Sequence, residues 1–242
     1  MLDFSPYDFN ATGHKDLDHA TPLFCAANEG NCEVVKLLIE ASENTRVDLN
    51  IQREDCSVKP TPLHAACYNG HVETVRLMLD NADEYGISLT ACGKFKYLPL
   101  HSAISMNKGR SDMFDRSDPL VLNEEKVSPF FLGKPWLVTV DWYLKKIEVV
   151  SLLLKHPVAR RNTNYNAVSD RSNCGFTPLH IASFDNSPEM VKLLLDNAKT
   201  LNVDLSIRSS TGHMPFEYAK GFGSEELCRL FPDYLIDNTY HI

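Results

Sequence analysis

The 242-residue sequence predicts an all-helical solenoid of stacked helix-turn-helix units. Three observations favour this fold. A short segment recurs along the chain, an apolar run follows each close copy at a fixed distance, and the apolar residues of that run fall on one face of a helix. Units of this kind bury their core against their neighbours, so the array forms one continuous structure whatever its length.

The recurring segment is most complete at residues 61–71, which read Thr-Pro-Leu-His-Ala-Ala-Cys-Tyr-Asn-Gly-His. Close copies begin at Thr21 and Thr177, and weaker copies begin at Leu98 and Met214. Threonine before proline is typical of a helix N-terminus. The threonine hydroxyl accepts from a backbone N–H of the first turn, and proline lacks the N–H that would have no partner within the helix at this position. A glycine then ends the close copies at residues 30 and 70. Each copy therefore predicts a short helix.

A second helix is predicted after each close copy. An apolar run begins 14 residues after each threonine, at Val35, Val75 and Val191. Its apolar residues share one helical face, and its charged residues lie on the other. Because a helix of about two turns is unstable alone in water, the two helices are expected to pack together.

These features resemble the ankyrin repeat, in which the Thr-Pro-Leu-His segment, the paired alanines, the Gly-His pair and the Val/Leu-rich run recur in this order. The resemblance extends over residues 18–231 and implies a binding scaffold rather than a catalyst. It divides this array into units near 18–56, 57–93, 94–172, 173–209 and 210–231.

Two segments flank the array. We expect residues 1–17 to form a cap over the first unit, with a disordered arm as the alternative. Residues 232–242 either pack on the last unit or lead into a further domain, and the sequence leaves both interpretations open.

The units are longer than the usual period of about 33 residues. Thr21 and Thr61 are 40 residues apart, and about four residues are added ahead of Val47-Asp48-Leu49-Asn50, which resembles the start of the family's hairpin. Four residues extend a helix by one turn and keep its apolar face in phase. We therefore expect longer second helices rather than longer loops.

The third unit contains an insertion over residues 109–143. Leu98 precedes Val150 by 52 residues where 14 are expected, so 38 are extra. Within the insertion, residues 120–132 favour a small β-hairpin, and residues 135–155 favour a second helix of nearly twice the usual length. The aromatic side chains either pack on the array or form a docking loop. The candidate contacts are Phe114, Phe130, Phe131 and Trp136.

The charge balance argues against nucleic acid and anionic membranes as partners. The chain has 32 acidic and 24 basic residues, a net charge of −8, whereas both surfaces attract basic proteins. The basic pairs Lys145-Lys146 and Arg160-Arg161 are predicted to be solvated helix ends.

Seven cysteines without Cys-x-x-Cys spacing favour free thiols in a reducing compartment. The N-terminus has no signal-like apolar stretch, and no run is long enough to insert into a membrane. We therefore expect a cytoplasmic protein, or one of the host cytoplasm or nucleus if it is a secreted bacterial effector.

By residue type, His64, His101 and His180 are the strongest candidates for catalysis. The resemblance instead implies a structural role, in which each imidazole bonds to the threonine position of its own segment and to the backbone of the next unit. Cys67 and His64 lack an orienting group and an oxyanion donor. The sequence has no metal-ligand spacing and no phosphate-binding loop. It therefore predicts neither an enzyme nor a metal or cofactor site.

The resemblance implies a concave binding face made by the hairpin tips and the outward positions of the inner helices. In the middle three units this face carries aromatic residues, which we expect to be exposed contact sites unless shifted hairpins or the insertion bury some of them. The candidate residues are Tyr68, Asn69, Phe95, Tyr97, Met106, Phe176, Phe184 and Asp185.

The predicted function is a non-enzymatic, monomeric adaptor that binds a protein or peptide through units two to four and through the insertion. Two alternatives stay open: the N-terminal targeting part of a larger bacterial effector enzyme, and an enzyme inhibitor that acts through the insertion. Asn50 is a candidate modification site, because it occupies the family's asparagine position that cytosolic hydroxylases can modify.

Overall fold

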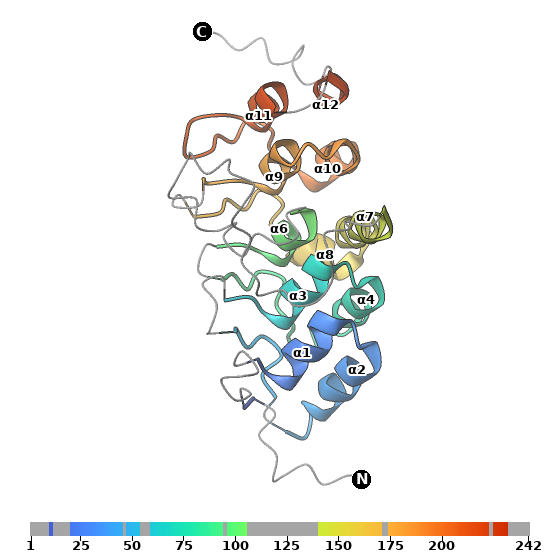
Figure 1. Ribbon diagram of the computed structural model, residues 1–242. Coiled ribbons are helices and arrows are strands. Elements are labelled where there is room, and N and C mark those ends of the chain that lie inside the picture. The colour runs from blue at the N-terminus through green and yellow to red at the C-terminus, as the bar shows by residue number, and fades with distance from the viewer. Residues whose placement is uncertain are drawn as a thin grey trace, which may run out of the picture. The chain divides into compact units, whose positions relative to one another are not determined.

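The computed structural model contains α-helices and connecting loops, and no strand among the residues that it describes (Figure 1). The chain divides into an N-terminal body, Met1–Ala103 with Leu137–Asn164, and a C-terminal body, Ile104–Trp136 with Tyr165–Ile242. The structure describes residues 10–11, 20–45, 47–53, 59–93, 96–105, 140–170, 174–222 and 225–231.

The inner helices of the N-terminal body are α1 (Pro22–Glu29), α3 (Pro62–Asn69) and α6 (Pro99–Ile104), whose last residue belongs to the other body. The predicted start signal operates as expected in α1, since the Thr21 hydroxyl oxygen accepts from the backbone N–H of Phe24 at 3.2 Å. The predicted stop also holds, because Gly30 follows α1 with φ of 72°. Helices α1 and α3 lie side by side (Figure 1).

The outer helices of this body are α2 (Cys32–Ala41), α4 (Val72–Asp80) and α7 (Val140–Lys155). Each buries most of the apolar run that the sequence predicted, although Leu37 in α2 is exposed. Helix α4 packs against both α2 and α7. Short helices follow two of them, α5 (Ala82–Tyr85) and α8 (Pro157–Asn162).

The C-terminal body contains two further helix pairs. The inner helix α9 (Pro178–Phe184) packs against α10 (Pro188–Leu201) and against α11 (Pro215–Phe222). Helix α12 (Glu225–Arg229) follows α11 and packs on it.

The predicted extra turn is present in α10, which has 14 residues and ends before Asn202 in the left-handed conformation. It is absent from α2, which has 10 residues and is followed by hydrogen-bonded turns. In α4 the added residues form the separate helix α5, because the chain bends at Asn81. The added residues therefore extend the helix in one pair and form separate turns in the others.

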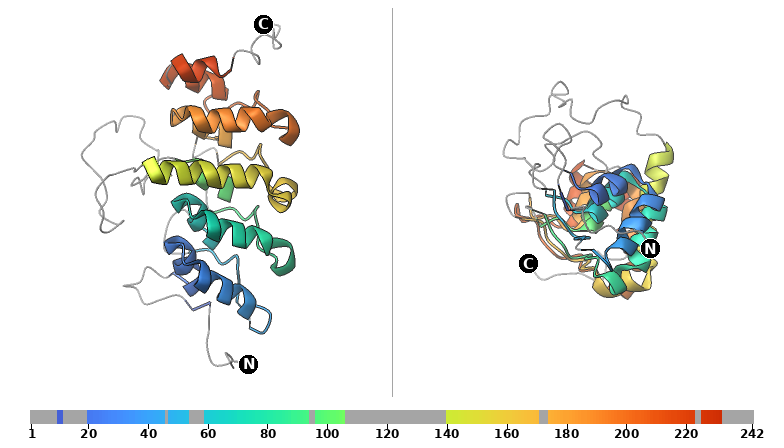
Figure 2. Two further views of the ribbon diagram at one scale, coloured as in Figure 1. Left: turned by 90° about the vertical axis from the view of Figure 1, so that its right-hand side faces the viewer. Right: turned by 90° about the horizontal axis from the view of Figure 1, so that it is seen from below.

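The predicted long helix of the third pair is confirmed within the described residues. Helix α7 has 16 residues, compared with 10 in α2 and 9 in α4, and Figure 2 shows it as the longest helix of the N-terminal body. The β-hairpin expected at 120–132, most of the cap at 1–17 and the tail at 232–242 lie outside the described residues. No helix in the described ranges is both long enough and apolar enough to span a membrane.

Candidate functional site

The histidines of the recurring segment bind the backbone of the next helix pair. The Thr61 N–H donates to His64 Nδ1 at 3.2 Å, and His64 Nε2–H donates to the Tyr97 carbonyl oxygen at 2.9 Å. His180 makes the same two contacts, with its own threonine at 3.2 Å and with the His213 carbonyl at 3.0 Å. A carbonyl oxygen can only accept, so Nε2 carries the proton in both rings. The structural role predicted for these two histidines is confirmed.

Burial makes His64 a weak base and keeps the Cys67 thiol protonated. It lowers the pKa of His64 from 6.5 to about 4, against a smaller opposing effect of the bond to Tyr97. It also raises the pKa of the Cys67 thiol to about 12, only partly offset by the Lys146 ammonium. Near pH 7 the imidazole is a weak base and the thiol is protonated, so the two do not form a nucleophile–base pair. Within the described ranges, no group of three or more His, Cys, Asp or Glu side chains could hold a metal ion.

A buried lysine joins three helices of the N-terminal body. Lys146, in α7, has no solvent exposure. Its Nζ donates to the carbonyl oxygens of Tyr68 at the end of α3 (3.1 Å) and Ser102 in α6 (2.8 Å). It also lies over the rings of Tyr68 and Trp142, 4.9 and 5.0 Å from their centroids. Two carbonyls and two aromatic faces together compensate for removing the ammonium from water.

The prediction that Lys145-Lys146 is a solvated helix end is therefore wrong for Lys146, although Lys145 is exposed and pairs with Asp141. The sequence does contain a sign of this burial. When the apolar runs that begin at Val75 and Val150 are aligned, Lys146 falls at the position of His71 in the preceding pair. His71 Nε2 donates to the carbonyl oxygen of Asn28 at 2.8 Å, which is the contact that Lys146 makes one pair later with Tyr68.

The two central rings of the predicted aromatic face are buried. Tyr97 is only 4% exposed and packs on His101, with ring centroids 5.0 Å apart. Phe176 is 6% exposed and packs on His180 and Tyr218, with ring centroids 5.6 and 5.0 Å away. The expectation that Tyr97 and Phe176 are exposed is wrong, because both rings cover the histidines of the recurring segment.

Other candidates lie beyond the described residues. These are the two face residues Phe95 and Met106 and the four insertion residues Phe114, Phe130, Phe131 and Trp136. Their proposed contacts stay predictions.

Part-exposed polar groups remain at the ends of the inner helices of the N-terminal body. Asn69 donates from Nδ2 to the Asn28 carbonyl at 3.2 Å and to Asn28 Oδ1 at 3.1 Å, which links the end of α3 to the end of α1. Glu29 is exposed, and Tyr68 is part-exposed above Lys146. We call Asn28, Glu29, Tyr68 and Asn69 the N-terminal surface.

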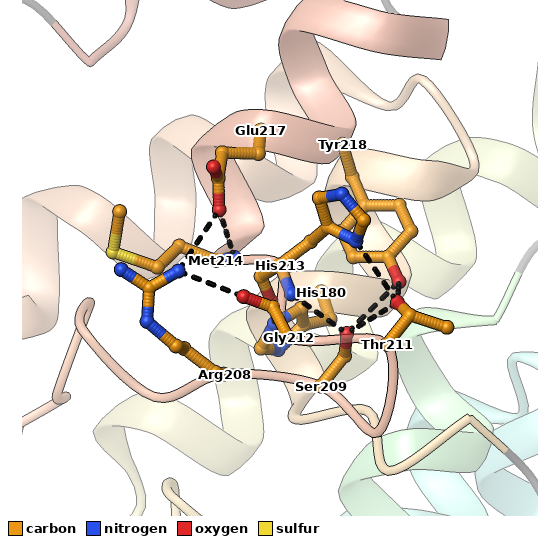
Figure 3. A network of polar contacts seen from close by, with 9 residues as sticks. All are labelled: His180, Arg208, Ser209, Thr211, Gly212, His213, Met214, Glu217 and Tyr218. Atoms are coloured by element: carbon orange, nitrogen blue, oxygen red, sulfur yellow. Dashed lines mark hydrogen bonds and ion pairs between the residues drawn. The ribbon is translucent and has the colours of Figure 1, made fainter.

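A second accessible group lies in the C-terminal body, around the buried ring of Tyr218. Phe184 is part-exposed at the end of α9, 6.1 Å from Tyr218, and Asp185 follows it. The Tyr218 hydroxyl contacts Thr211 Oγ1 at 2.8 Å, and this oxygen is 3.0 Å from His213 Nδ1 (Figure 3). Thr211 and His213 are exposed. We call Phe184, Asp185, Thr211 and His213 the C-terminal surface.

The last helix pair replaces the histidine with a carboxylate. Glu217 occupies the histidine position, and its Oε2 accepts from the Met214 N–H at 2.6 Å, as His64 Nδ1 accepts from Thr61. Arg208 lies 3.5 Å from the same oxygen and donates to the Gly212 carbonyl at 2.7 Å (Figure 3). Sequence reasoning missed this role, although the position of Glu217 in the weak copy signals it.

Both polar ends of Asn50, the candidate modification site, contact the next hairpin. Its Nδ2 donates to the Gly86 carbonyl at 2.8 Å, and its Oδ1 accepts from the Ser88 N–H at 2.7 Å. The side chain is part-exposed. Modification of Asn50 stays a prediction.

Comparison with known families gives the same family for most of the chain. The model described as ankyrin repeats (3 copies) matches residues 2–82 and 23–115, and the model described as ankyrin repeats (many copies) matches residues 162–219. Comparison with curated proteins gave no match. The matched ranges contain the recurring segments whose threonine, histidine and glycine contacts are described above, and the chain belongs to the ankyrin repeat family.

Proposed function

We propose that this chain is an adaptor that binds a protein or peptide through the N-terminal and C-terminal surfaces. Ankyrin repeats generally act as protein-interaction modules, which supports the class of function. The recurring histidines and threonines are used to hold the helix pairs together. Recognition therefore falls to the side chains that stay accessible at the helix ends and hairpin tips.

The observation that carries the proposal is the position of Phe184 beside Asp185. A phenyl ring that is part-exposed, yet fixed by Phe176 at 5.8 Å and Tyr218 at 6.1 Å, loses little entropy when a partner covers it. A neighbouring carboxylate favours a cationic group above the ring, since guanidinium stacks on aromatic faces and pairs with carboxylates. We infer that the partner presents an arginine here.

The N-terminal surface has a different chemistry. Asn28, Asn69 and Glu29 present amide and carboxylate groups at the ends of two inner helices. Such groups suit the backbone N–H groups and basic side chains of an extended peptide. Both surfaces thus favour a basic partner, which is consistent with the net charge of −8.

A peptide selection tests the proposal. Peptides that bind the full chain are selected from a random library, and their affinities are measured for the wild type and for Phe184→Ala and Asp185→Ala. We expect arginine-containing peptides whose affinity falls about tenfold or more in both variants, as for anchor residues. Lys192→Ala and Lys199→Ala change exposed positions of α10 and serve as controls.

Circular dichroism and thermal melting verify that the Phe184 variant is folded, and Phe184→Leu tests the ring without leaving a cavity. Selected peptides that bind all variants equally would contradict the C-terminal surface as a binding site.

The free thiols support a cytoplasmic site of action. Each of the six cysteines in the described ranges is free: Cys25, Cys32, Cys67, Cys92, Cys174 and Cys228. Free thiols are normal in a reducing compartment.

A further inference from the structure

The N-terminal and C-terminal surfaces differ in the charge beside their aromatic rings. In the N-terminal surface, Lys146 Nζ lies over the Tyr68 ring, 4.9 Å from its centroid. In the C-terminal surface, the Phe184 ring packs on two other aromatic rings, and Asp185 follows it in the chain. One ring therefore has a cation against it, and the other has aromatic neighbours and an adjacent carboxylate.

The cation beside Tyr68 is fixed in position. Lys146 has no solvent exposure, and its Nζ donates to the carbonyl oxygens of Tyr68 at 3.1 Å and Ser102 at 2.8 Å. Carbonyl oxygens are neutral, so these two bonds hold the ammonium without cancelling its charge. The nitrogen that lies over the Tyr68 ring also binds the Tyr68 backbone, so the ring and the charge keep their relative positions.

A cation on an aromatic ring changes what else the ring can bind. A ring attracts a cation through the negative potential of its face, and a second cation at the same ring is repelled by the first. A second aromatic ring is favoured instead, because its own negative face is attracted by the positive charge beyond the first ring. Tyr68 is part-exposed, so a partner side chain that reaches it meets a ring of reduced negative potential.

We propose that the N-terminal surface selects an aromatic side chain of the bound peptide at Tyr68 and disfavours arginine and lysine there, and that Lys146 sets this preference through the ring. The inference rests on the proposed function, because it concerns a peptide on that surface. The basic side chains that the surface favours then lie at Glu29, which is exposed. Peptides for this surface combine an aromatic residue with a basic one, whereas peptides for the C-terminal surface place an arginine on Phe184.

A peptide series tests the preference on the wild-type chain. Peptides from the random library are sorted by their loss of affinity for Tyr68→Ala, and a double-mutant cycle identifies the peptide residue that contacts the ring. This residue is changed to phenylalanine, tryptophan, leucine or arginine, and the dissociation constants are measured. We expect the aromatic peptides to bind about tenfold more tightly than the arginine peptide, the effect of two unit charges roughly 10 Å apart near a protein surface.

Lys146→Met removes the charge and keeps a long apolar side chain. In this variant the preference for aromatic residues over arginine should shrink to about twofold. Lys145→Met is the matched control, because it removes the same charge from the next residue of α7, where the side chain is exposed and paired with Asp141. The control should keep the wild-type ratio, since solvent and salt screen an exposed charge. Circular dichroism verifies that both variants are folded, and the wild-type series decides the preference without them.

The outcomes separate the inference from the proposed function. Equal affinity of the wild type for arginine and aromatic residues at Tyr68 would overturn the inference and leave the proposed function in place. The wild-type ratio in a folded Lys146→Met variant would overturn the role of Lys146. If Tyr68→Ala weakened none of the selected peptides, the N-terminal surface itself would be contradicted, and the inference with it.

Discussion

The buried histidines make the stability of the protein depend on pH. In the folded chain the pKa of His64 and of His180 is lowered by burial to about 4, compared with an ordinary value of 6.5. Between these values the unfolded chain binds protons that the folded chain does not, so stability is complete above pH 6.5 and falls as the pH drops towards 4. The loss amounts to about 3 kcal/mol for each histidine.

Urea unfolding at pH 7.5 and pH 4.5 measures this loss. The His64→Gln and His180→Gln variants are expected to be less stable at pH 7.5 and to lose less stability on acidification than the wild type. His213→Gln changes an exposed ring and should keep the wild-type difference. If the His64 and His180 variants lost as much stability between pH 7.5 and pH 4.5 as the wild type does, the buried histidines would not be the cause of the loss.

The contribution of the buried Lys146 to stability can be measured against that of its exposed neighbour Lys145. Lys146→Ala removes two hydrogen bonds and two ring contacts and leaves a cavity among α3, α6 and α7. We expect the free energy of unfolding to fall by about 3 kcal/mol or more. Lys145→Ala removes only an exposed ion pair with Asp141 and should cost less than about 1 kcal/mol. Equal losses in the two variants would show that the buried contacts do not stabilise the protein.

At the scale of elements, the cost of replacing a glycine that ends a helix depends on what covers that glycine. Gly30 and Gly86 both have positive φ, 72° and 69°. A Cβ on Gly30 would lie 2.5 Å from His71 Nδ1, whereas a Cβ on Gly86 would meet nothing within 4 Å. Gly86→Ala should therefore cost only the left-handed strain, about 1 kcal/mol.

Gly30→Ala should cost about 1–2 kcal/mol more than Gly86→Ala, because it also displaces His71 from the Asn28 carbonyl. Chemical denaturation of the two variants gives the difference. Equal costs would mean that the contact between His71 and Asn28 contributes nothing.

Helix positions could be predicted from the sequence because the signals are local. Threonine before proline, the glycine stops and the apolar runs located α1 to α4 and α9 to α11. The apolar spacing of residues 135–155 predicted that α7 is longer than α2 and α4. The fate of the added residues could not be predicted, since four residues extend α10 but form α5 after the bend at Asn81.

The accessible surfaces were harder to predict, because exposure depends on contacts between units. The family motif places Tyr97 and Phe176 on the binding face, but their rings lie against His101 and His180. The burial of Lys146 is indicated only when the apolar run of its helix is aligned with that of the preceding pair, because the Lys145-Lys146 pair alone is typical of a solvated helix end. Tyr68, Phe184 and Asp185 remain accessible in part, and their role in binding is a proposal.

For the whole molecule, a deletion separates the adaptor from an inhibitor that acts through its insertion. The N-terminal and C-terminal surfaces are built from residues outside 110–134. A variant that lacks residues 110–134 should therefore bind the selected peptides with affinities within about twofold of the full chain, because energetic effects at separated sites are nearly independent. Isothermal titration of both proteins compares them. Loss of binding would favour the insertion as the site.

The most direct test of the proposed binding role is a hydrogen-exchange footprint of a selected peptide on the wild-type chain. We expect a peptide that binds the C-terminal surface to protect the end of α9 and the hairpin tip, near 183–187 and 209–214. A peptide that binds the N-terminal surface should protect the ends of α1 and α3, near 28–31 and 68–71. Protection confined to the outer helices α2, α4 and α10, with these segments unchanged, would contradict the proposed role.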